Sequence, residues 1–167
     1  MTQLSSKLNR EIYLVQNPSI GAAILWRFIC GYYSQENKAA PFPLLFLVLP
    51  VIFRQDLCEV IKSTQKKSGL TKVSEKLFSG RKNDQLYYIH NAAEQYKQLT
   101  LSSISIGMSA KLFIVDTKTA FVLPLTQSNK SGITQSAKYL LDAAEKLGVW
   151  CSELTLHEIS TLLKVRF

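Results

Sequence analysis

The side chains able to do chemistry in this 167-residue sequence are few, and the cysteines illustrate it best. Cys30, Cys58 and Cys151 lie far apart, and no CxxC or cysteine–histidine pair has the spacing of metal ligands. An odd number of cysteines argues against a disulfide framework. Since the N-terminal stretch MTQLSSKLNREIYLVQ has no apolar region typical of a signal peptide, we expect buried thiols in a cytoplasmic protein.

The two histidines and the carboxylates predict no catalytic set. His90 follows two tyrosines, a setting that favours a hydrogen-bonded structural role. His157 and Glu158 are adjacent, so on a helix they point about 100° apart. Asp56 and Glu59 share a helix face, but a metal site of nuclease type needs a third ligand. The sequence has no GxxxxGK[ST], GxGxxG or GxSxG motif. We therefore expect no enzymatic activity, no metal and no cofactor.

Positive charge is concentrated in one segment, and this segment is the main functional candidate. The chain carries a net charge of +8. Residues 62–82 include seven Lys or Arg residues and one Glu, so the net charge of this segment is seven minus one, or +6. Such a segment can contact the phosphates of double-stranded DNA without reading sequence, bind an acidic protein partner, or simply be solvated. The candidate residues are Lys62, Lys66, Lys67, Lys72, Lys76, Arg81 and Lys82, with Lys118 extending the surface if a hairpin wing adjoins it.

The stretch PFPLLFLVLPVIF, residues 41–53, is almost wholly apolar. A membrane-spanning helix needs roughly 20 apolar residues, so we expect no membrane span. Pro50 removes a backbone donor, which predicts a helix from about residue 43 that bends or ends near Pro50 and resumes in RQDLCEVIKST. A helix that is apolar all round belongs in the core or against a partner. The residues that we predict to pack in the core or against a partner are Trp26, Phe46, Leu49, Phe53 and Trp150.

The order of expected elements predicts a single α+β domain, residues 1–167, that is mainly α-helical. An N-terminal arm over 1–16, with EIYLV as a short strand, precedes a helical part over 17–110. The runs LFIV and AFVLPL flank the polar DTKT, which predicts a β-hairpin over 111–126. Helices over 132–167 close the domain. Helices followed by a hairpin are typical of a winged-helix module.

Local signals place several helix ends. Asn17 is a good N-cap and Pro18 suits the first helical position. The stretch SGLTKVSEKLFSG predicts a helix starting near Thr71. Residues 83–112 are expected to form one or two helices. Thr155 caps a last short helix, which the sequence KVRF follows as a terminal strand.

Three stretches together carry a family resemblance: NPSIGAAILWRFICGYY, PFPLLFLVLPVIF and LGVWCSELTLHEISTLLKVRF. They resemble the middle component of bacterial three-component ABC-ATPase systems, a small protein encoded between an ATPase like SMC or Rad50 and an effector. The Lamassu antiphage and anti-plasmid systems are the best-known relatives. The matching positions are Asn17-Pro18, Gly31-Tyr32, Pro43 to Pro50, Leu147-Gly148-Val149-Trp150 and Leu163-Lys164-Val165-Arg166.

This resemblance implies a non-catalytic accessory subunit. It would bind the SMC-like ABC ATPase, help to hold the effector nuclease and take part in sensing foreign DNA. The alternative is a stand-alone winged-helix transcription regulator, which would be a symmetric dimer on a palindromic site. The sequence shows no helix rich in Arg, Asn and Gln for reading bases, so we prefer the adaptor.

Overall fold

The computed structural model describes residues 17–79, 88–127 and 135–167. The expected N-terminal arm with its EIYLV strand lies outside these residues, as do Arg81 and Lys82.

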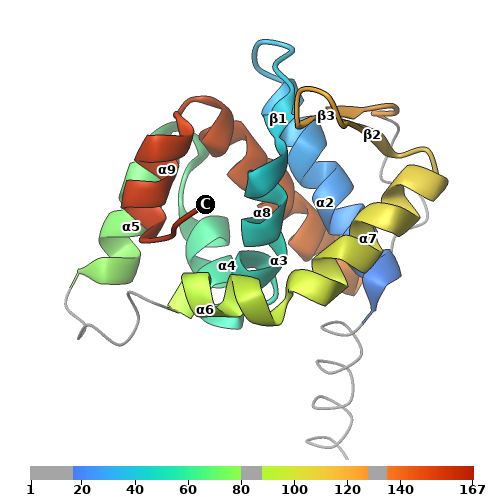
Figure 1. Ribbon diagram of the computed structural model, residues 1–167. Helices are drawn as coiled ribbons and strands as arrows, with labels where there is room; N and C mark the ends of the chain where they lie inside the picture. Colours follow the sequence, from blue (N-terminus) through green and yellow to red (C-terminus); the bar gives the residue numbers. More distant parts are fainter. Residues whose placement is uncertain (1–16, 80–87, 128–134) are drawn as a thin grey trace, which may run out of the picture.

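Two helices far apart in the chain lie side by side at the centre of the molecule, α2 (Pro18–Tyr33) and α8 (Gln135–Ser152) (Figure 1). The start of α2 is as predicted: Pro18 occupies its first turn, and the Asn17 side chain accepts from the backbone N–H of Ser19 at 2.9 Å. Helix α8 runs unbroken through Gly148. These two helices carry much of the core.

The apolar stretch 41–53 folds largely into the core. Its first residues belong to β1 (Ala40–Pro41) and the 3₁₀ turn η1 (Phe42–Leu44), and α3 (Leu45–Ile52) follows. Every residue of α3 except Phe46 is buried. Pro50 lies inside α3, which ends two residues later, and the chain resumes as α4 (Gln55–Ser63). The predicted break after Pro50 is therefore confirmed.

Short helices wrap this core. They are η2 (Lys66–Ser68), α5 (Gly69–Phe78), α6 (Tyr88–Gln95), α7 (Lys97–Ser109) and α9 (Leu156–Leu163). The prediction that α5 starts near Thr71 was wrong by two residues, because Gly69, at φ 70°, turns the chain directly from η2 into the helix. Thr155 caps α9 in a reciprocal arrangement with Glu158, as predicted.

The expected terminal strand is absent from the described residues. Lys164 adopts a left-handed conformation, φ 55°, at the end of α9. The N–H of Val165 then bonds to the carbonyl of Ser160 at 3.1 Å. The chain thus folds back on its own helix, whose last carbonyls act as the acceptors, and it pairs with none of the strands that the structure describes.

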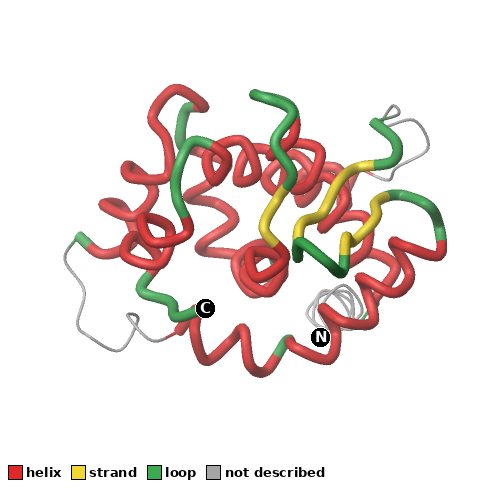
Figure 2. The backbone as a smooth tube through the Cα atoms, turned by 45° about the horizontal axis from the view of Figure 1, so that its top comes forward, coloured by secondary structure: helices red, strands yellow, loops and turns green. Residues whose placement is uncertain are grey.

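The predicted hairpin is confirmed as β2 (Phe113–Asp116) and β3 (Phe121–Pro124), which pair antiparallel with Ile114 opposite Leu123. The short β1 joins as a third strand, in the order β1-β3-β2. Figures 1 and 2 show this sheet above α2 and α7, at the other end of the molecule from α5 and α9.

The fold is α+β and mainly helical, as predicted, and the sheet formed by the described residues is small and three-stranded. A relation to winged-helix modules stays a prediction. No helix within the described ranges is long and apolar enough to cross a bilayer.

Candidate nucleic-acid or acidic-partner interface

The described lysines of the basic segment lie on three consecutive elements of the chain, α4, η2 and α5. Lys62 lies in the last turn of α4, Lys66 and Lys67 in η2, and Lys72 and Lys76 in α5. All five side chains are exposed. We call these five lysines the basic surface. With Glu75 as the one acidic residue from 62 to 76, five minus one leaves +4.

The backbone beneath the basic surface is held by α8. The ammonium group of Lys146 donates to the carbonyl oxygens of Ile61, Lys62 and Thr64, at 3.2, 3.1 and 3.1 Å. The indole N–H of Trp150 donates to the carbonyl of Lys66 at 2.8 Å. Carbonyls at a helix C-terminus attract a cation, so Lys146 fixes the end of α4.

Burial lowers the pKa of Lys146. The Asp142 carboxylate opposes this shift, and the charge of Lys66 adds to it. The cost of removing the ammonium from water is offset by the three carbonyl acceptors. Lys146 therefore supports the basic surface from below. No local sequence signal marks this role, because its partners lie more than 80 residues away.

Three of the five lysines are engaged within the molecule. The Lys62 amine lies 5.1 Å from the ring centroid of Tyr139. Lys72 pairs with Glu75 at 2.8 Å, and this hydrogen bond raises the pKa of Lys72. Lys76 donates to the Thr64 hydroxyl at 3.0 Å. These contacts limit the directions in which the three ammonium groups point.

Lys66 and Lys67 differ from these three. Among the described residues, no acidic side chain lies within ion-pair distance of either. Both lie on η2, whose backbone Trp150 holds. They are the charges that the structure presents to an external anion.

Lys118 does not join the basic surface. It lies in the turn between β2 and β3, and its N–H donates to the Asp116 carboxylate at 2.9 Å. Both views place this hairpin at the opposite end of the molecule from α5 (Figures 1 and 2).

The selected apolar residues divide into two groups. Trp26, Leu49 and Trp150 are buried, whereas Phe46 and Phe53 are half-buried. Phe46 meets Phe42 edge-on with ring centroids 5.5 Å apart, and Phe53 stacks on Tyr96 at 6.0 Å.

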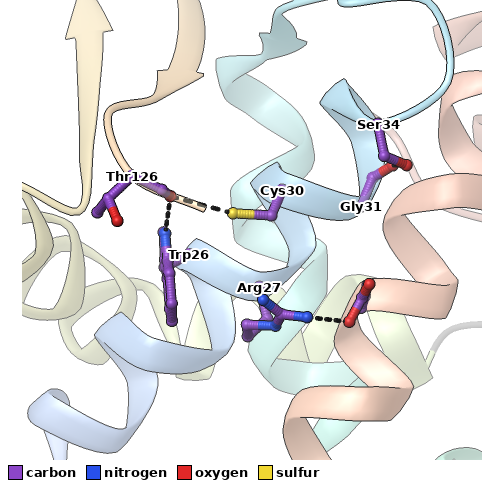
Figure 3. A network of polar contacts seen from close by, with 7 residues as sticks. Trp26, Arg27, Cys30, Gly31, Ser34 and Thr126 are labelled. Atoms are coloured by element: carbon purple, nitrogen blue, oxygen red, sulfur yellow. Dashed lines mark hydrogen bonds and ion pairs between the residues drawn. The ribbon is translucent and has the colours of Figure 1, made fainter. Parts of the chain in front are cut away.

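Trp26 also anchors the end of the hairpin. Its indole N–H donates to the carbonyl of Thr126 at 2.7 Å, and the Cys30 thiol points at the same oxygen at 3.6 Å (Figure 3). One turn of α2 thus fixes the chain as it leaves the sheet. The adjacent Arg27 points the other way, towards α8, where it pairs with Glu145.

The cysteines show no sign of reactivity. All three are buried and free. Burial raises the pKa of Cys30 and of Cys58 to about 11, and that of Cys151 to about 12. Such thiols stay protonated at neutral pH and are poor nucleophiles. In the described ranges, no three His, Cys, Asp or Glu side chains are grouped to hold a metal ion.

The described residues form a mainly helical domain whose basic surface is held from below by Lys146 and Trp150. Comparison with known families identifies the class of protein. The chain belongs to the family described as ABC-three component (ABC-3C) system Middle Component 3, whose sequence pattern matches residues 5–167. It is accordingly an accessory middle component of a multi-component system that includes an ABC ATPase. No curated protein and no solved structure matches the chain.

Proposed function

We propose that this protein is the non-catalytic adaptor of a Lamassu-type defence complex in the cytoplasm. It bridges an ATPase resembling SMC or Rad50 and an effector nuclease, and its basic surface contacts double-stranded DNA without reading sequence. The observation that carries the adaptor role is the family match along nearly the whole chain. The reactive groups agree with it, since the thiols are buried.

The DNA contact rests on the arrangement of the five lysines. Exposed amines on two helices and the turn between them suit a row of phosphates, because phosphate contacts need charge and reach more than fixed geometry. The main-chain support from Lys146 and Trp150 keeps this row in place. An acidic protein surface is the competing ligand for the same amines.

A stand-alone winged-helix regulator is the second hypothesis. It would need a helix beside the hairpin able to read base edges. The neighbouring α7, KQLTLSSISIGMS, carries a single basic residue, Lys97. This composition favours the adaptor over the regulator.

Co-purification tests the proposal. The protein is tagged, expressed with the other two components encoded beside it, and captured at 0.5–1 M salt, on the order of the concentration at which simple charge attraction is screened. The mass of the eluted complex is then measured. A stable assembly containing a coiled-coil ATPase is expected. Elution of a homodimer alone, which then selects a palindromic DNA site, would favour the regulator.

A further inference from the structure

The outer face of the small sheet exposes large apolar side chains. Ile114 is 47% exposed, Phe121 42%, Leu123 37% and Leu125 54%. The opposite face of the same strands is closed, with Phe113 and Val122 at 0%. We call Ile114, Phe121, Leu123 and Leu125 the outer stripe. It holds four of the eight exposed large apolar side chains of the described residues.

Strand register places these four side chains side by side. Ile114 and Leu123 are directly opposed partners, so their side chains lie on one face. Phe121 and Leu125 lie two residues to either side of Leu123 and share this face. The N–H of Leu125 still bonds to the Leu112 carbonyl at 2.9 Å, which extends the pairing beyond β3. The outer stripe is continuous.

The outer stripe is also held rigidly from below. The indole N–H of Trp26 holds the chain at Thr126, directly after Leu125. At the other end, the N–H of Phe42 bonds to the carbonyl of Ala120 at 2.9 Å. Phe113 packs against Gly107 of α7, where an added Cβ would stand 2.3 Å from its ring. A fixed apolar surface loses little conformational entropy when a partner covers it.

The dimensions of the outer stripe suit a helix. From Phe121 to Leu125 four residues of strand span about 13 Å. Apolar side chains at i, i+3 or i+4, and i+7 of a helix span about 10 Å, on a cylinder about 10 Å wide. A helix packed on a sheet face is one of the standard layered arrangements of proteins.

Charge around the outer stripe identifies the chemistry of that helix. Lys111 lies beside the Leu125 end and Lys118 in the turn at the Phe121 end, and both are exposed. Residues 111–125 contain two lysines and one acid, Asp116, so two minus one leaves +1. Asp116 lies opposite Phe121 on the same face, and its carboxylate accepts the backbone N–H of Lys118. Two copies of this chain would bring two net positive faces together, whereas carboxylates at both ends of a partner helix would be attracted to Lys111 and Lys118.

We propose that the outer stripe docks an amphipathic helix of another component of the system, with apolar residues at i, i+3 or i+4, and i+7 and carboxylates at both ends. This inference rests on the proposed adaptor function and adds the surface at which a partner binds. It is separate from the basic surface, which lies at the other end of the molecule (Figure 1).

The test is a set of variants in the co-expressed three-component system. Ile114→Thr/Leu123→Thr removes two apolar side chains and keeps strand-forming residues. Losing two such contacts should weaken the affinity for one component about a hundred-fold. Phe167→Ser is the matched control, because Phe167 is 51% exposed at the C-terminus, away from the sheet. Circular dichroism and the melting temperature check that each variant folds.

Loss of one component from the double variant, with full recovery from Phe167→Ser, supports the proposal. Lys118→Glu should also weaken that contact, and more at low salt than at high salt. Equal recovery of all components from wild type and double variant overturns docking at the outer stripe and leaves the adaptor function standing. If even the wild type captures no component, the adaptor function fails and this inference fails with it.

Two further outcomes overturn the proposal in favour of other occupants. One is a wild-type homodimer that the double variant converts into a monomer, measured by sedimentation. The other is binding of the wild type, lost in the double variant, to vesicles of phosphatidylglycerol while the complex stays intact.

Discussion

Gly148 of α8 faces the carbonyl oxygen of Phe28 in α2 so closely that an added Cβ would stand 2.1 Å from it. Gly31 of α2 meets the Glu145 carbonyl in the same way, also at 2.1 Å. The two helices therefore cross with their backbones in contact at both glycines. This crossing sets the position of Lys146 and Trp150, and through them of the basic surface.

Gly148→Ala should destabilise the protein, because the new methyl group meets backbone atoms that cannot rotate away. Overpacking of this kind costs about 3 kcal/mol, and alanine returns about 1 kcal/mol of helix propensity, which leaves a net loss of about 2 kcal/mol. Urea unfolding measures it. Ser102→Ala, at an exposed site of α7, should change stability by less than about 0.5 kcal/mol. Equal stability of the Gly148 variant and the wild type would contradict the close crossing.

Removing one member of the Arg27–Glu145 pair should destabilise the protein more than replacing both members by apolar residues. The Arg27 side chain is 8% exposed, and its Nε has no hydrogen-bond partner. Glu145→Ala leaves a buried cation without its carboxylate and should cost about 2 kcal/mol, below the usual range for buried pairs since Glu145 is one-third exposed. The double variant Arg27→Met/Glu145→Leu should lose less than the single one, as measured by thermal unfolding. A larger loss in the double variant would show that the pair is a net source of stability.

Lys146→Met should loosen the end of α4 and the basic surface with it. The three carbonyls that Lys146 satisfies lose a charged donor, at a cost of about 2 kcal/mol. Hydrogen exchange of residues 62–68 should speed up more than that of α2. Lys138→Met removes an exposed lysine of the same helix and serves as the control. If both variants exchange alike, the support assigned to Lys146 is wrong.

Reversing charge on the basic surface should weaken DNA retention by the complex. Lys66→Glu/Lys67→Glu/Lys72→Glu removes up to three phosphate contacts, so the plot of log affinity against log salt should become shallower by about three. Fluorescence anisotropy with a duplex of unrelated sequence measures this slope, and assembly should stay intact. The control variant Lys38→Glu/Lys97→Glu changes net charge by four, against six in the triple variant, at exposed sites outside α4, η2 and α5. DNA retention that is unchanged at low salt would exclude the DNA role.

Much of the secondary structure could be predicted because its signals are local. Asn17 and Pro18 mark the start of α2 through one side chain and one fixed backbone angle. The polar residues between LFIV and AFVLPL mark the hairpin. The errors at Thr71 and at KVRF occurred where a glycine turn and a left-handed residue override local propensity.

The sequence by itself determined the kind of surface that this protein offers: exposed lysines in one segment, few reactive groups, and a family motif built around Asn17, Gly31 and Gly148. Only the tertiary structure decided which charges lie together, because that depends on contacts across the chain. Lys146 reaches carbonyls more than 80 residues away, and Lys118 is carried to the far end with the hairpin. The position of the outer stripe also depends on the tertiary structure. Both faces of the two strands carry apolar residues, and the packing of α2 and α7 against one face decides which face stays exposed.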